Sequence, residues 1–328
     1  MTGLSDSFQR PINYLRISVT DRCNLRCIYC MPACGVSLMS HDDILTYEEI
    51  YTVVRAAAEL GIDKVRLTGG EPLVRLGLPG LVRMLARIGS INDISLTTNG
   101  LLLGRYAAEL KQAGLGRVNV SLDTLKPEKF RLITRGSNGL GEVLAGIEAA
   151  RLAGLNPVKI NVVVMAGIND DELVDFAAKT ISEGWHIRFI ELMLPVGVSM
   201  AAAQVVPAGE MRERLGVLGE LEPCLPGAGN GPARYFRFPG AVGTLGFITP
   251  VSEHFCFGCN RLRLTSDGRL RPCLLAEDEV DLKPSLRRGV SSAELKRLIE
   301  TAVSRKPLRH HLDEGRMPKD RPFSQVGG

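Results

Sequence analysis

Three cysteines stand within eight residues near the start of the chain, in the segment TDRCNLRCIYCMP. They are Cys23, Cys27 and Cys30, with the spacing C-x3-C-x2-C. A structural zinc site usually has four ligands, often as C-x2-C pairs, and a disulfide framework needs an even number of cysteines. Three thiolates on one loop can instead bind three irons of a [4Fe–4S] cluster and leave the fourth iron open to a small molecule. Reduced cysteines on a solvated loop, or part of a zinc site, are the alternatives.

A second set of three cysteines lies near the other end of the chain, with the spacing Cys256-x2-Cys259-x13-Cys273. His254 stands two residues before this set, so a zinc site with three cysteines and one histidine is chemically reasonable. An auxiliary iron–sulfur cluster is the other interpretation. The donor types alone leave both open.

Length and composition limit the class of protein that carries these cysteines. The chain has 328 residues and a formal net charge of +4, which is too mild to indicate a nucleic-acid partner. The N-terminal segment MTGLSDSFQR has no apolar signal core, and no stretch reaches about 18 uninterrupted apolar residues. We therefore expect a cytoplasmic protein without a membrane span, in which eight cysteines serve metal binding rather than disulfides.

Strands and helices alternate over the first 190 residues, which predicts a parallel α/β fold. The predicted strands span 12–18, 64–68, 93–97, 117–122, 158–165 and 186–191, and the helices between them span 47–60, 79–88, 104–113, 142–153 and 170–183. Parallel strands buried on both faces are continuously apolar, yet these carry polar residues at a period of two, which favours a polar, ligand-filled barrel interior. We predict an open six-stranded barrel with its site at the C-terminal ends of the strands.

The inward-facing polar set includes Arg16, Arg66, Lys159 and Arg188. Arg261-Leu262-Arg263, between the later cysteines, places two more guanidinium groups on one side of a strand. A joint clamp for a polyphosphate is one interpretation, and a solvated surface pair at Arg261 and Arg263 is the other.

The character of the chain changes after residue 191. We predict a boundary between a barrel domain of residues 1–218 and a smaller domain of residues 219–328. Short strands are expected at 234–238, 245–249 and 261–265, with a Ser266-Asp267-Gly268 hairpin turn and a helix at 293–303. The tail from residue 305 is polar and irregular, and His310 in it has no evident partner.

Several segments, taken in order, resemble one known family. The cysteine loop resembles that of the radical S-adenosylmethionine (SAM) enzymes, and the chain is similar over nearly its whole length to the molybdenum cofactor biosynthesis protein A (MoaA) family of GTP 3′,8-cyclases. The matching segments are RPINYLRISVTDRCNLRCIYCMP, VRLTGGEP, TTNG, VNVSLDTL, RFIELM, FCFGCNRLRLTSDGRLRPCL and the terminal Gly-Gly. ELMLPVG departs from the pattern by one extra residue.

This resemblance implies an incomplete (β/α)6 TIM-like radical SAM barrel with a smaller C-terminal cluster-binding domain. It implies a lyase with two [4Fe–4S] clusters that uses a SAM-derived 5′-deoxyadenosyl radical to convert GTP into (8S)-3′,8-cyclo-7,8-dihydroguanosine 5′-triphosphate, the first step of molybdopterin biosynthesis.

The resemblance also implies roles for individual residues. Those expected to bind clusters are Cys23, Cys27, Cys30, Cys256, Cys259 and Cys273. Those expected to contact SAM are Tyr29, Gly70, Glu71, Ser121 and Met193. Those expected to contact GTP are Arg16, Arg66, Thr97, Lys159, Arg261 and Arg263. Those expected to act in catalysis are Arg261, Arg263, Gly327 and Gly328.

The expected partners follow from the same resemblance. They are GTP, SAM, an external electron donor such as a flavodoxin or ferredoxin, and a downstream cyclic pyranopterin monophosphate synthase, with a homodimer as one expected assembly and no nucleic acid or membrane. Two other functions stay open at this point. One is another radical SAM enzyme with an auxiliary cluster, for example a peptide-modifying one, and the other is a zinc-stabilised nucleotide- or RNA-binding barrel.

Overall fold

The structure is a computed structural model that describes residues 3–194, 205–225, 229–314, 318, 321 and 323–327. In these residues twelve strands form one sheet in the order β12-β11-β10-β1-β2-β3-β4-β5-β6-β9-β8-β7. The first six are β1 (Tyr14–Ser18), β2 (Lys64–Thr68), β3 (Asp93–Thr98), β4 (Arg117–Ser121), β5 (Val158–Val164) and β6 (His186–Glu191). The later ones are β7 (Glu222–Pro223), β8 (Arg234–Arg237), β9 (Thr244–Ile248), β10 (Arg261–Leu264), β11 (Arg269–Arg271) and β12 (Val280–Asp281).

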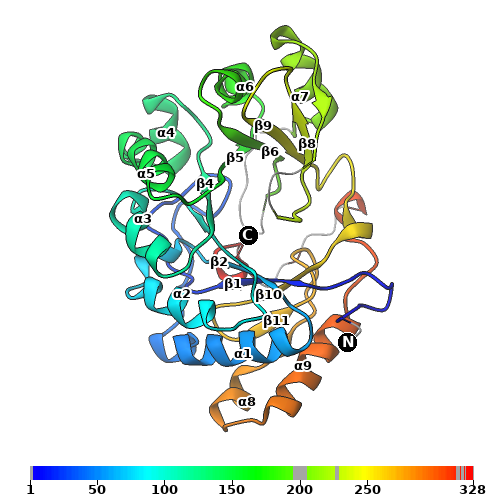
Figure 1. The fold of residues 1–328 in the computed structure, drawn as a ribbon. Coiled ribbons are helices and arrows are strands. Elements are labelled where there is room, and N and C mark those ends of the chain that lie inside the picture. The colour runs from blue at the N-terminus through cyan, green and yellow to red at the C-terminus, as the bar shows by residue number, and fades with distance from the viewer. Residues whose placement is uncertain are drawn as a thin grey trace.

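The predicted parallel array is confirmed, because β1 to β6 pair in sequence order and all in parallel. Two later strands extend this array with the same direction: β10 pairs with β1, and β9 pairs with β6. The strands curve around a central opening, which Figure 1 shows nearly end-on. The predicted boundary at 218/219 stays a prediction, and strands from both sides of it share one sheet.

Register explains why the interior is polar. Arg16 lies beside Arg66 on β2 and beside Arg263 on β10, so three guanidinium groups start from one level of the ring. Leu15 and Ile17, which alternate with Arg16 along β1, are fully buried in the apolar core on the outer side. The period of two thus divides each strand between a polar interior and an apolar exterior.

Helices cover the outer face of the sheet (Figure 1). They are α1 (Tyr47–Glu59), α2 (Leu78–Ala86), α3 (Leu103–Gln112), α4 (Pro127–Thr134), α5 (Leu140–Leu152), α6 (Leu173–Ser182), α7 (Ala208–Leu215), α8 (Lys283–Arg287) and α9 (Ser292–Ser304), whereas α10 (Phe323–Val326) lies against β1 on the inner side. The predicted capping box at the start of α1 is present, because Thr46 accepts from the Glu49 amide and Glu49 accepts from the Thr46 amide. Such a cap stabilises a helix by about 1 kcal/mol.

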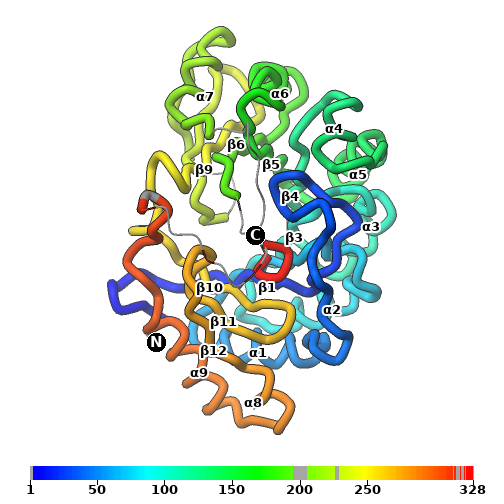
Figure 2. The backbone as a smooth tube through the Cα atoms, turned by 180° about the vertical axis from the view of Figure 1, so that it is seen from behind, coloured from blue at the N-terminus to red at the C-terminus, as the bar shows by residue number. Residues whose placement is uncertain are grey.

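The C-terminal segment returns to the centre of the ring. In Figures 1 and 2 the red segment α10 lies beside β1 near the central opening. The hydroxyl of Ser18 on β1 donates to the carbonyl of Ser324 on α10 at 3.4 Å. The expectation of an irregular polar tail is therefore wrong for this part, because Ser324 and Val326 are buried against the barrel.

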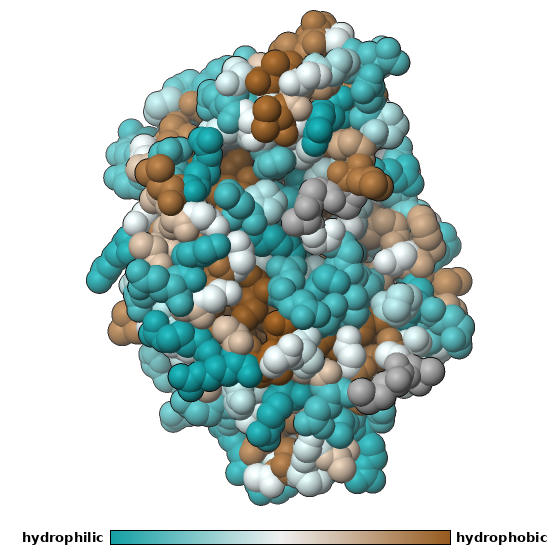
Figure 3. All heavy atoms as spheres, in the orientation of Figure 1, coloured by the Kyte–Doolittle hydropathy of each residue, from teal (hydrophilic) through white to brown (hydrophobic). Residues whose placement is uncertain are grey.

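Hydrophilic residues cover most of the face drawn in Figure 3, and hydrophobic residues lie among them, some of them gathered near its centre. Among the described helices, none combines the length and apolar character needed to cross a bilayer.

Candidate functional site

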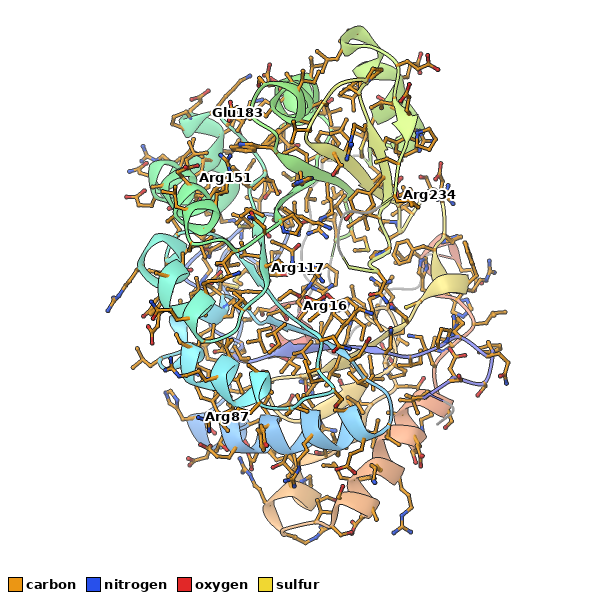
Figure 4. The ribbon with its side chains drawn as sticks, in the orientation of Figure 1. Arg16, Arg87, Arg117, Arg151, Glu183 and Arg234 are labelled. Atoms are coloured by element: carbon orange, nitrogen blue, oxygen red, sulfur yellow. The ribbon has the colours of Figure 1, made fainter. Side chains whose placement is uncertain are left out.

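A cavity of about 310 Å3 occupies the centre of the ring and is lined from both ends of the chain. All six cysteines of the two sets line it. Arg16 and Arg117 point toward the centre in Figure 4, whereas Arg87, Arg151 and Glu183 lie on the outer helices. The topology therefore brings two cysteine sets, separated by more than 200 residues in the chain, to the wall of one chamber.

The N-terminal cysteine loop is held by main-chain contacts on two sides. Gly70 donates its amide to the carbonyl of Thr20 at 2.8 Å, and the Glu71 amide donates to that of Arg22 at 2.8 Å. A Cβ at Gly70 would collide with the Arg22 carbonyl, so this close approach requires glycine. On the other side, Ile28 donates its amide to the carbonyl at residue 133 of α4 at 2.9 Å.

Burial dominates the electrostatics of this loop. It raises the pKa of the Cys27 thiol well above its usual range and that of Cys30 to about 12, and the charge of Asp123 adds to both effects. Asp123 accepts hydrogen bonds from the hydroxyl of Tyr29 at 2.8 Å and from the amide of Val163 at 2.8 Å. Asp123 is thus an acidic neighbour of Cys27 and Cys30. Burial also raises the pKa of the Cys23 thiol, an effect to which the charge of Glu71 adds and which the charge of Arg26 opposes.

In the C-terminal set, Cys256 and Cys259 come before β10 in the chain and Cys273 comes after β11. The Cys259 amide donates to the Cys256 carbonyl at 3.1 Å, and Cys273 follows β11 after the predicted Ser266-Asp267-Gly268 turn, which is confirmed. Burial alone would raise the pKa of the Cys259 thiol, but the charges of Arg261 and Lys306 lower it to about 6. Cations rather than carboxylates therefore surround this set.

The donor sets fit iron–sulfur clusters. In each set a main-chain N–H two residues after a cysteine donates to its sulfur, from Leu25 to Cys23 and from Leu275 to Cys273, both at 3.4 Å. The described residues contain no group of three His, Cys, Asp or Glu side chains close enough for a single metal ion. A [4Fe–4S] cluster does not need such a group, because each cysteine binds a different iron.

Five arginines line the same cavity, and they are Arg16, Arg66, Arg188, Arg261 and Arg263. Burial lowers the pKa of Arg16 well below its usual range, and the charges of Arg263 and Arg66 lower it further. Burial likewise lowers the pKa of Arg188 and of Arg263 to about 10. Crowded buried cations of this kind have a high affinity for a polyanion, because it relieves both their desolvation and their mutual repulsion.

Two of these arginines, Arg66 and Arg188, make contacts with uncharged groups. Arg66 donates to the hydroxyl of Ser95 at 3.2 Å and lies over the ring of Tyr14. Arg188 donates to the side-chain oxygen of Asn119. None of these partners is an acid, so the positive charge of the lumen is not neutralised by them.

Gly327 reaches into the ring and meets one of these arginines. Its carbonyl accepts a hydrogen bond from Arg263 at 2.6 Å. The residue has φ +67°, and a Cβ on it would collide with the hydroxyl of Thr68. Only glycine satisfies both conditions, since it tolerates a positive φ and has no side chain. Gly328, predicted to act with it, lies outside the described residues.

The remaining predicted residues divide into those at the cavity and those behind it. Tyr29, Gly70, Ser121, Met193 and Thr97 line the cavity. The lining does not include Glu71, whose buried carboxylate accepts hydrogen bonds from Leu73, Thr98 and Asn99.

Lys159 is also absent from the lining. Its ammonium group donates to the hydroxyl of Tyr235 at 3.2 Å. Burial, followed by the charge of Arg188, lowers its pKa to about 7. Lys159 is therefore close enough to Arg188 and Arg66 for their charges to act on it, although it does not line the cavity.

Some lining residues belong to the predicted polar inner face but were given no individual role, and one more was expected to have no partner. Asp123 and Asn161 line the cavity, and within the described chain the side-chain oxygen of Asn161 is buried without a hydrogen-bond partner. Their position at the polar period of β4 and β5 was the available signal. His310 is buried, lines the cavity and packs against the ring of His254 at 4.7 Å, so the expectation that it has no partner is wrong. Its polar sequence surroundings gave no sign of this.

Two family descriptions match successive parts of the chain. Residues 17–179 match the Radical SAM superfamily, and residues 185–312 match Molybdenum Cofactor Synthesis C. Among solved structures, Streptococcus suis SuiB bound to S-adenosylmethionine is similar with a TM-score of 0.62 at 14% identity, covering 85% of this chain and 66% of that one. This likeness shows the fold.

Curated relatives match over the full length. The GTP 3′,8-cyclase of Moorella thermoacetica is 55% identical over 327 residues, which cover 99% of this chain and 100% of the relative. The GTP 3′,8-cyclase of Pelotomaculum thermopropionicum is 55% identical over 328 residues, with 99% and 100% covered. The GTP 3′,8-cyclase of Heliobacterium modesticaldum is 53% identical over 327 residues, with 98% and 99% covered.

Proposed function

The chain belongs to the GTP 3′,8-cyclase family of radical SAM enzymes, and from this premise we propose that its central cavity binds SAM and GTP together between two [4Fe–4S] clusters. The observation that carries the proposal is the convergence of five arginines and two sets of three cysteines on one cavity. The proposed reaction is the joining of C3′ and C8 of GTP at the start of molybdenum cofactor biosynthesis.

We assign the N-terminal cluster to Cys23, Cys27 and Cys30. When bound, this cluster and SAM supply the electron and the 5′-deoxyadenosyl radical that removes the 3′-hydrogen of GTP. Gly70, Tyr29, Ser121 and Met193 line the cavity on the SAM side, and the lack of a side chain at Gly70 lets the main chain approach the ligand closely. Glu71 acts from behind, by fixing the strand end through its three hydrogen bonds.

The arginines hold the triphosphate and set the direction of the base. Arg16, Arg66 and Arg263 start from one level of the ring, and a triphosphate can accept charge-assisted hydrogen bonds from several of them at once. Thr97 offers a buried hydroxyl that has no partner among the described residues. Lys159 strengthens the positive field from behind Arg188.

The C-terminal cluster on Cys256, Cys259 and Cys273 lies beside Arg261, whose guanidinium group is 3.6 Å from the Cys259 sulfur. Three cysteines leave one iron without a protein ligand, and a ring nitrogen or the carbonyl oxygen of guanine has the chemistry to occupy it. Triphosphate contacts and base contacts would then fix the distance between the ribose and C8.

The partners and the compartment rest on family membership. The reaction needs two electrons from outside, one to cleave SAM and one, with a proton, to reduce the radical left on guanine once C3′ and C8 are joined. A flavodoxin or ferredoxin is suitable for both, and the product suits a cyclic pyranopterin monophosphate synthase. All eight cysteines are free thiols, which supports a reducing cytoplasmic location. We keep a homodimer as a proposal on the same ground.

Product analysis tests the function. Anaerobically reconstituted protein with reductant, SAM and either GTP or ATP should form 5′-deoxyadenosine and a cyclised product with GTP alone. A charge-assisted hydrogen bond contributes about 1.5–3 kcal/mol, so removing Arg261 and Arg263 together should weaken GTP binding by at least about tenfold. Arg151→Ala, on the outer helix α5, is the matched control. Equal GTP affinity in the double variant and the control would disprove the clamp.

A further inference from the structure

Lys306 follows α9 directly and enters the protein interior, although the tail that contains it was expected to be polar and irregular. Its exposed fraction is 3%. The helix before it is fixed by four buried residues, Leu295, Ile299, Ala302 and Val303. The ammonium group is therefore delivered to one place from a rigid element.

The ammonium group joins the two segments that carry the C-terminal cysteines. It donates to the carbonyl of Arg261 at 2.8 Å and to the carbonyl of Pro272 at 2.6 Å. These carbonyls lie two residues after Cys259 and one residue before Cys273. A third contact goes to the sulfur of Cys259. These contacts lie within the cysteine site, and no carboxylate is among them.

The neighbouring cation Arg10 differs in this respect. Arg10 donates to the carbonyls of Cys256 at 2.7 Å, Leu308 at 2.8 Å and Pro307 at 2.7 Å, so it also supports the site from the outside. Its charge is balanced by Asp6, which lies 2.6 Å away and is buried. Of these two buried cations, Lys306 is the one whose charge acts on the cysteine site without a paired acid.

We propose that Lys306 is a positioning residue for the C-terminal cluster, which ties its two cysteine segments together and raises its reduction potential. The proposal rests on the assignment of Cys256, Cys259 and Cys273 as cluster ligands. A [4Fe–4S] core with three thiolates becomes more negative by one unit when it accepts an electron. A buried cation within hydrogen-bond distance of one ligand stabilises that reduced state more than the oxidised one.

A redox titration tests this role without using the cyclisation reaction. The full-length chain with Cys23, Cys27 and Cys30 replaced by Ala carries only the C-terminal cluster, whose reduction by dithionite can be followed by electron paramagnetic resonance. Lys306→Met should lower the ratio of reduced to oxidised cluster about tenfold at a fixed potential, which equals 59 mV for one electron. Lys306→Arg, which keeps the charge, should restore most of the potential.

The matched control is Lys296→Met, on the exposed face of α9, where the lysine pairs with Glu59 at 2.8 Å. It should leave the potential unchanged. An unchanged potential in Lys306→Met with full iron content would overturn the proposal. If Lys306→Met loses the cluster while Lys306→Arg keeps cluster and potential, the charge is required as proposed. Loss of the cluster in both variants would assign a purely structural role and also overturn it.

Iron analysis separates this inference from the proposed function. A C-terminal set that binds no iron in the parent protein would refute the cluster assignment itself. Iron bound at full content with a potential that ignores Lys306 would refute only the role of Lys306.

Discussion

The N-terminal and C-terminal cysteine sites each bring three thiols to one cavity, and both support a sulfur with an N–H donor at 3.4 Å. Their charged neighbours differ. Asp123 acts on Cys27 and Cys30, whereas Arg261 and Lys306 act on Cys259. These neighbours of the two similar ligand sets thus carry charges of opposite sign.

This difference matches the two tasks of the reaction. A cluster that gives an electron to SAM must be a strong reductant, and a negative neighbour favours its oxidised state. A cluster beside a triphosphate clamp lies where positive charge is concentrated for the substrate. Arg261, which we propose as part of the triphosphate clamp, also acts on the Cys259 thiol, so the proposal links substrate binding to cluster electrostatics at this end of the barrel.

The largest expected effect comes from removing one ligand at each site. Cys27→Ala should abolish 5′-deoxyadenosine formation, because SAM cleavage depends on the N-terminal cluster. Cys273→Ala should retain SAM cleavage and lose cyclised product. Liquid chromatography of both products measures this directly. Retained 5′-deoxyadenosine formation in Cys27→Ala, or unchanged cyclisation in Cys273→Ala, would show that the two clusters do not have these separate roles.

Thiol reactivity in the metal-free protein compares the two fields directly. With a pKa of about 6, Cys259 is mostly thiolate at pH 7, and its alkylation should rise through pH 6 and then level off. Cys30, with a pKa of about 12, should react slowly and still be accelerating at pH 9. After allowing for the lower nucleophilicity of the more acidic thiol, we expect at least about a 100-fold difference at pH 7. Mass spectrometry of iodoacetamide-treated protein measures it, and equal rates would contradict the comparison.

Much of this architecture could be predicted from local sequence. The six strands were predicted within two residues of their observed ends, because a polar period of two and intervening helices are local signals. The parallel pairing of β10 with β1 and of β9 with β6 could not be predicted in this way, since it joins residues that are far apart in the chain. The short helix α4, which begins at Pro127 and supports the cysteine loop, was missed because its apolar face has only a few residues.

In the candidate site, too, some residues could be predicted from local sequence and others could not. The cysteines and arginines were found by type and spacing, and their convergence agrees with the predicted barrel. Lys306 gave no signal, because a lysine in a polar segment is usually exposed and only tertiary packing decides its burial. The expected contact of Glu71 with SAM stays a prediction, whereas its hydrogen bonds from the Thr98 hydroxyl and the Asn99 amide come from the end of another strand and could not be predicted from local sequence.

A smaller effect is expected at Gly327, whose carbonyl accepts a hydrogen bond from Arg263. Gly327→Ala adds a side chain at a positive φ and against Thr68, at a cost of about 1–3 kcal/mol, so cyclisation should fall about 5- to 150-fold with both cluster spectra unchanged. Gly289→Ala is the control, because Gly289 has φ +73° with nothing within 4 Å of its Cβ position. Product rates in the two variants separate backbone strain from intrusion into the site. Equal rates would return Gly327 to the role of an ordinary chain end.

The smallest expected effect is a shift in the reduction potential of the N-terminal cluster. It is tested by an experiment that corresponds to the one on Lys306. Asp123→Asn keeps the shape and one acceptor oxygen, which can receive the Val163 amide, and its NH2 group can donate to the Tyr29 hydroxyl oxygen; the negative charge near Cys27 and Cys30 is removed. The reduced state should become more stable relative to the oxidised state. The ratio of reduced to oxidised N-terminal cluster should then rise about 3- to 30-fold at a fixed potential, which equals a rise in reduction potential of roughly 30–90 mV. Asp171→Asn, an exposed carboxylate paired with Lys126 and Lys129, is the control.

The sign of this shift is decisive. A negative neighbour and a positive neighbour must move their clusters in opposite directions when each is neutralised, if local charge sets the two potentials. A fall in potential in Asp123→Asn, or no change beside the Asp171→Asn control, would mean that burial rather than charge distinguishes the N-terminal site. The two cysteine sites would then differ in solvation alone, since both lie in the same barrel and present the same three donors to it.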